Sequence, residues 1–64
     1  MKLYELSRDS LFMIDEEGYR KDIFRLEKLD GMYSRCYDDQ GQLIHLAGFT
    51  PVIKVGDWIP DAKA

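Results

Sequence analysis

The sequence has little of what marks secreted, membrane or metal-dependent proteins. Its 64 residues include one cysteine, one histidine and two prolines, so no internal disulfide can form, whereas small secreted domains carry several. The longest apolar run, Leu11 to Ile14, is far shorter than the roughly 20 residues that span a bilayer. Glu5 stands where a signal peptide has its apolar stretch. We therefore expect a cytoplasmic protein that does not enter a membrane.

The chain also lacks an excess of positive charge. Nine basic residues against twelve acidic ones give a net charge of −3, whereas nucleic-acid-binding domains usually carry a positive field that meets phosphates. No glycine-rich phosphate-binding motif is present either. Nucleic acid is therefore not the expected partner.

Catalytic and metal-binding arrangements are missing as well. In the strand pairing derived below, Cys36 points into the core and His45 points outward, so the two cannot share an ion or form a dyad. The turn Asp38–Gln42 lacks the length and the closing Glu of a calcium loop. Glu16 and Glu17 are neighbours in a loop, which fixes no separation for acid–base catalysis. We expect no enzymatic activity, no metal and no cofactor.

What is present is a regular spacing of turn signals. Glycines recur at positions 18, 31, 41, 48 and 56, and segments of about ten residues between turns are typical of small all-β domains. One domain spanning 1–64 is expected, ordered over about 3–59, with a frayed C-terminal tail. The strands are predicted at Ser10–Ile14, Ile23–Lys28, Met32–Tyr37, Gln42–Leu46 and Val52–Val55.

A helix over Lys21–Leu29 is the alternative for the second segment. Ile23, Leu26 and Leu29 fall at helical spacing, and Gly31 stands near the place of a C-cap. No capping box precedes the segment. The glycine spacing favours a strand.

Two hairpins with Gly in the third loop position predict the strand register. Loops Leu29–Gly31 and Asp39–Gly41 would place both glycines in the left-handed region. This register sets Lys28 opposite Met32 and Cys36 opposite Ile44. The two hairpins then agree on one core face: Phe24, Leu26, Met32, Ser34, Cys36, Ile44 and Leu46.

The same register predicts a basic and aromatic outer face. Arg25 falls opposite Arg35, and Arg35 falls opposite His45, although like charges across strands destabilise a sheet. Tyr33 and Tyr37 flank the row. Tyr and Arg are enriched in binding hot spots. This row is therefore interpreted in two ways, as a contact surface or as a plain solvated face.

The remaining aromatic residues divide between core and surface. Phe12, Phe24 and Phe49 are expected in the core. Trp58 either covers the open end of the sheet or forms an exposed anchor after the last strand.

A three-stranded meander flanked by a short first and a short last strand resembles the SH3-like small β-barrel. The resemblance rests on SLFMI at Ser10–Ile14, the hairpins at Gly31 and Gly41, and FTPVIKV at Phe49–Val55. It implies a five-stranded barrel. A short, acidic chain with one cysteine is also similar to small accessory proteins of tailed bacteriophages, many of which redirect one host protein.

Three functions follow from these observations. The first is a non-enzymatic module that binds one protein partner, a second copy of the chain included, through a surface that meets an acidic or aromatic patch. The second is a binder of a small anion or nucleotide through Arg25 and Arg35. The third is an acidic nucleic-acid mimic using Asp15, Glu16, Glu17, Asp38 and Asp39. For the first, the predicted contact residues are Arg25, Tyr33, Arg35, Tyr37, His45 and Trp58.

Overall fold

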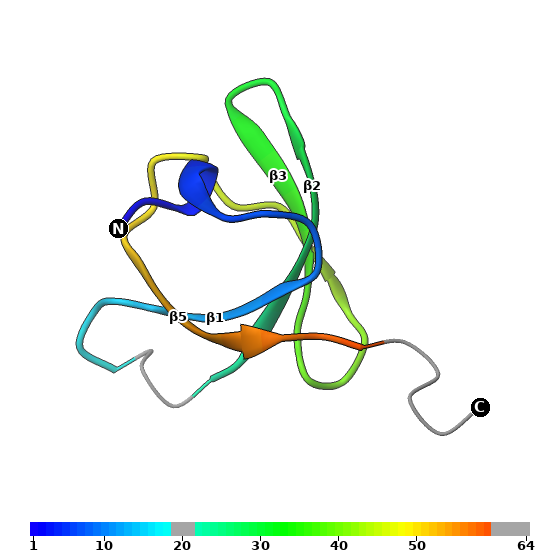
Figure 1. Ribbon diagram of the computed structural model, residues 1–64. Coiled ribbons are helices and arrows are strands. Elements are labelled where there is room, and N and C mark those ends of the chain that lie inside the picture. The colour runs from blue at the N-terminus through cyan, green and yellow to red at the C-terminus, as the bar shows by residue number, and fades with distance from the viewer. Residues whose placement is uncertain (19–21, 60–64) are drawn as a thin grey trace.

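A computed structural model describes residues 1–18 and 22–59 as an all-β protein with a single five-stranded sheet. The strands are antiparallel and lie in the order β4-β3-β2-β1-β5 (Figure 1). They are β1 (Ser10–Ile14), β2 (Phe24–Asp30), β3 (Tyr33–Tyr37), β4 (Leu43–Ile44) and β5 (Val52–Asp57). A short 3-10 helix, η1 (Leu3–Glu5), precedes β1.

The segment for which a helix was the alternative is a strand, because Phe24–Asp30 pairs with both β1 and β3. Lys21, the first residue of the helical alternative, and the tail from position 60, which was expected to fray, lie outside the described residues. The sheet curves, but hydrogen bonds do not close it, since β4 and β5 remain at its two edges. The expected barrel is thus a five-stranded antiparallel sheet with an open ladder.

The core lies on one face of this sheet. Phe12 and Phe24 stack with their ring centroids 5.7 Å apart, and Cys36 is completely buried beside them. The 3-10 helix, which the sequence did not indicate, and the residue that caps its C-terminal end add Leu3 and Leu6 to the same cluster. The buried apolar side chains are Leu3, Leu6, Phe12, Ile14, Phe24, Leu26, Cys36 and Val52.

The 3-10 helix is joined to the last part of the chain. The N–H of Leu3 donates to the carbonyl of Thr50 at 2.9 Å, and the N–H of Val52 donates to the carbonyl of Met1 at 2.8 Å. The turn before β5 therefore packs against η1. Figure 1 shows these two segments beside each other at one end of the molecule.

The second hairpin has the predicted register. Cys36 pairs with Ile44, and the N–H of Asp38 donates to the carbonyl of Gln42 at 3.1 Å across a three-residue loop. Gly41 has a φ of 80°, a backbone conformation that glycine adopts without strain. One carboxylate oxygen of Asp38 accepts the N–H groups of Gln40 and Gln42 at 2.9 and 2.8 Å, which fixes the turn.

The first hairpin has a different register from the predicted one. Asp30 pairs with Tyr33, so the loop is the two residues Gly31 and Met32, and Gly31, with a φ of 64°, takes the first central position, where type II′ turns need glycine. Met32 is consequently 73% exposed, not in the core as predicted.

A β-bulge at Glu27 restores the phase of this hairpin. Beyond it, Leu26 pairs with Cys36 and Arg25 pairs with Tyr37, two residues away from the predicted partners. Because side chains alternate with a period of two, a displacement of two residues leaves each on its predicted face. The inward positions of Phe24, Leu26, Ser34 and Cys36 are therefore confirmed.

Candidate binding cleft

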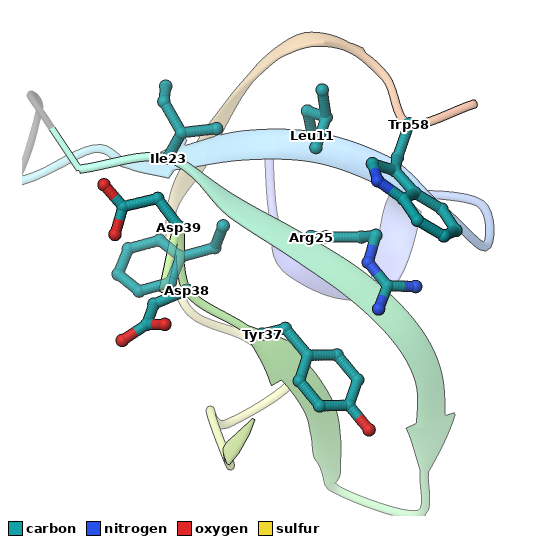
Figure 2. A pocket seen from close by; sticks show the side chains of 8 residues that line it. Leu11, Ile23, Arg25, Tyr37, Asp38, Asp39 and Trp58 are labelled. Atoms are coloured by element: carbon teal, nitrogen blue, oxygen red, sulfur yellow. The ribbon is translucent and has the colours of Figure 1, made fainter. Parts of the chain in front are cut away.

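The site begins with one row of paired residues that crosses all five strands on the face opposite the core. Gly56 pairs with Leu11, Leu11 with Arg25, Arg25 with Tyr37, and Tyr37 with Leu43. The next residues along the chain after β5 bring Trp58 over the same face (Figure 2).

Arg25 is the centre of the row. Its guanidinium carbon lies 4.0 Å from the ring centroid of Trp58 and 4.8 Å from that of Tyr37, so the cation lies between two aromatic faces (Figure 2). Its Nη1 also donates to a carboxylate oxygen of Asp9 at 3.3 Å. Three contacts from three parts of the chain thus fix one side chain.

Asp9 holds this arrangement through its backbone as well as its carboxylate. Its N–H donates to the carbonyl of Leu26, and its carbonyl accepts the N–H of Trp58, both at 2.7 Å. Asp9 has a φ of 68°, the only positive φ among the described residues other than glycine. Strained backbone held in place by its surroundings is often found at functional sites.

A cleft of about 260 Å³ opens beside Arg25. Aromatic and aliphatic groups form one part of its wall, and two carboxylates from the turn after β3 form another. Figure 2 shows Trp58 and Tyr37 on either side of Arg25, with Ile23 and Asp39 at the far end. The lining residues are Leu11, Ile23, Phe24, Arg25, Tyr37, Asp38, Asp39 and Trp58.

The predicted contact residues do not form one continuous basic row. The structure brings Arg25, Tyr37 and Trp58 together. Arg25 does not lie opposite Arg35, because the bulge at Glu27 changes the pairing. The predicted juxtaposition of Arg25 and Arg35 is therefore absent, and Lys28 is the residue opposite Arg35.

Arg35 instead forms an ion pair beside the cleft. Its Nε lies 3.0 Å from a carboxylate oxygen of Glu27. The hydrogen bond from Arg35, followed by smaller contributions that include Tyr37, lowers the pKa of Glu27. The same hydrogen bond raises the pKa of Arg35. Tyr37, which contacts Arg25, is also a smaller cause of both pKa shifts.

Tyr33 and His45 stand apart from the cleft lining. Tyr33 is 60% exposed and pairs with Asp30 at the hairpin end of the sheet. His45 is exposed, and its Nδ1 lies 3.2 Å from the backbone carbonyl of Ser34. These two predicted residues border the outer face without reaching Arg25.

The structure corrects one aromatic assignment. Phe12 and Phe24 are buried as expected, but Phe49 is 62% exposed. It follows Gly48, whose N–H donates to the carbonyl of Met32 and whose carbonyl accepts the N–H of Tyr4. The tight turn closes through backbone hydrogen bonds, and the Phe49 ring is left outside the core.

The sequence did not indicate the other members of the site. Asp9 carries a weak signal, since Asp tolerates the left-handed region better than most residues. Asp38 and Asp39 were predicted as turn residues and as part of the acidic nucleic-acid mimic, and Leu11 and Ile23 only as strand residues. Their convergence depends on contacts between β1, β2 and the turn after β3, which are distant in sequence.

No protein family, curated protein sequence or solved structure matches the chain significantly. Within the described residues, no group of three His, Cys, Asp or Glu side chains is arranged to hold a metal ion. No helix in that part of the chain has the length and apolar character of a membrane span.

Proposed function

We propose that the chain is a non-enzymatic interaction module that binds one protein partner through the cleft beside Arg25. The observation that carries the proposal is the stacking of the Arg25 guanidinium between Tyr37 and Trp58 at the border of an open cleft. Arg, Tyr and Trp are the residue types most enriched in binding hot spots.

Preorganisation of these side chains supports the proposal. Asp9, Tyr37 and Trp58 already hold Arg25 in one position, so a partner has little side-chain entropy left to remove on binding. Trp58 remains 39% exposed despite its contact with Arg25, so part of its surface is free for a partner.

The anion-binding alternative is less well supported by the same contacts. Each arginine on which it depends already has a carboxylate partner, Asp9 for Arg25 and Glu27 for Arg35. A phosphate would have to displace these carboxylates before it could bind. No contact among the described residues specifically favours the nucleic-acid mimic.

The finer assignments of fold and setting belong to the proposal as well. We propose an SH3-like barrel, which the meander β2–β4 flanked by β1 and β5 supports. A cytoplasmic accessory protein of the tailed-bacteriophage type is the proposed setting. That part rests on size, acidity and the single cysteine alone.

The test is quantitative capture from the cells in which the protein occurs, with the tagged wild type and three tagged variants. Trp58→Ala and, separately, Ile23→Ser should reduce recovery of the partner at least tenfold, about 1.4 kcal/mol. Phe49→Ala, which removes an exposed aromatic ring outside the cleft, should leave recovery unchanged.

Each form is first checked by its amide NMR spectrum, so that loss of fold is not read as loss of binding. Sedimentation velocity of the purified chain distinguishes a second copy from a foreign partner. Equal recovery of one partner with the wild type, Trp58→Ala and Ile23→Ser would refute the proposal.

A further inference from the structure

The uncompensated charge in the cleft is negative. Arg25 is neutralised by Asp9, whereas Asp38 and Asp39 form no ion pair among the described residues. Asp38 has one oxygen engaged by backbone N–H groups, which leaves its charge in place. The sequence predicted a basic surface for an acidic or aromatic patch of the partner, and the geometry places uncompensated negative charge in the cleft instead.

The size and lining of the cleft indicate what kind of group fits it. Its volume of about 260 Å³ lies below the ~300–1,000 Å³ of sites for drug-sized ligands. Trp58 offers apolar surface at one end, and at the other end Asp38 and Asp39 offer charge with the apolar side chain of Ile23 beside them. Long basic side chains combine an apolar stem with a cationic head in this way.

We propose that the occupant is a linear basic segment of a partner protein. An arginine or lysine places its head at Asp38 and Asp39, and its stem, or a neighbouring apolar residue, packs against Ile23 and Trp58. This inference rests on the proposed function and adds the chemistry of the partner.

An acidic segment fits the same surface poorly. It would have to compete with Asp9 for Arg25 and would face two carboxylates at close range. Like charges brought together at an interface oppose binding and suppress wrong partners. The cleft therefore selects basic over acidic segments.

The experiment is a selection from a displayed library of random twelve-residue peptides, with the whole chain as the target. Peptides enriched on the wild type should be rich in Arg and Lys and poor in Asp and Glu. A synthetic peptide from the selection should shift the indole N–H resonance of Trp58 in a titration followed by NMR.

Matched variants test the two carboxylates. The double variant Asp38→Asn/Asp39→Asn keeps an oxygen that can accept the turn hydrogen bonds of Asp38, so the turn is preserved. It should weaken the selected peptide at least tenfold. Asp30→Asn is the control for the loss of a carboxylate elsewhere, because it removes one negative charge at the exposed hairpin turn, away from the cleft. It should leave affinity unchanged.

Three results would overturn the inference. Selected peptides that are acidic or uncharged, yet move the Trp58 resonance, would refute the basic chemistry and keep the cleft as the binding site. Basic peptides that bind equally to the double variant would show non-specific attraction to an acidic protein. Failure to select any peptide would refute a linear segment, while the capture experiment with Trp58→Ala still tests the proposed function separately.

Discussion

The carbonyl of Asp9 accepts the backbone N–H of Trp58 at 2.7 Å, and the side chains of both residues contact Arg25. One residue before β1 therefore positions a tryptophan that follows β5. The cost is a left-handed backbone at Asp9. This relationship makes the cleft depend on a residue outside its lining.

Two substitutions of Asp9 should separate backbone strain from loss of charge. Asp9→Asn and Asp9→Ala both remove the carboxylate, but Asn adopts the left-handed region more readily. We expect Asp9→Ala to be less stable than Asp9→Asn by about 1 kcal/mol, measured by urea unfolding. Equal stability of the two variants would show that the positive φ costs nothing.

The fluorescence of Trp58 should report on Arg25. Trp58 is the only tryptophan in the chain, and Arg25 covers its ring at 4.0 Å. Arg25→Ala should therefore move its emission to longer wavelength and increase quenching by acrylamide. Arg35→Ala, which removes the neighbouring cation paired with Glu27, is the control and should change neither. An unchanged spectrum in Arg25→Ala would contradict the stack.

Gly41 should be sensitive to substitution because of its backbone. A Cβ at this position would meet no other atom within 4 Å, so only the positive φ opposes a side chain. Gly41→Val should lower the free energy of unfolding by more than about 1 kcal/mol, and Gly41→Asn should cost less. Thermal or urea unfolding measures both, and a Val variant as stable as the wild type would contradict the turn geometry.

Cys36 should be chemically quiet in the native protein. Desolvation by burial raises the pKa of its thiol, against a smaller opposing effect of the Ser34 hydrogen bond. Because the thiolate is the reactive form, Ellman's reagent should label Cys36 only through unfolding, at a rate that rises with added urea. Rapid labelling without denaturant would place the thiol at the surface.

The sequence predicted the face of the sheet on which a residue lies more reliably than its partner on the neighbouring strand. Alternation placed Cys36 inward and Arg25 outward, and both positions hold even though the register of the first hairpin was wrong. The bulge at Glu27 has no distinctive residue type, so local pattern could not reveal it. Its effect was limited because a shift of two residues preserves the faces.

The candidate site was only partly predictable for a similar reason. Arg25 and Tyr37 belong to adjacent strands, so strand pairing placed them on one face. Trp58 reaches them through the left-handed turn at Asp9, and nothing in the local sequence around Trp58 specifies that contact. The sequence predicted a positive surface around Arg25, but in the structure Asp9 neutralises this residue.

The hydrogen bonds between η1 and the segment around β5 also affect the order in which the protein folds. Met1 and Val52 are separated by 51 positions in sequence, so these bonds form only after a long loop has closed. Loop closure of this kind carries an entropy cost that nearby hairpins avoid, and distant contacts slow folding. We therefore expect the β2–β3 and β3–β4 hairpins to form early and the cleft, which needs Trp58 beside Arg25, to be assembled last.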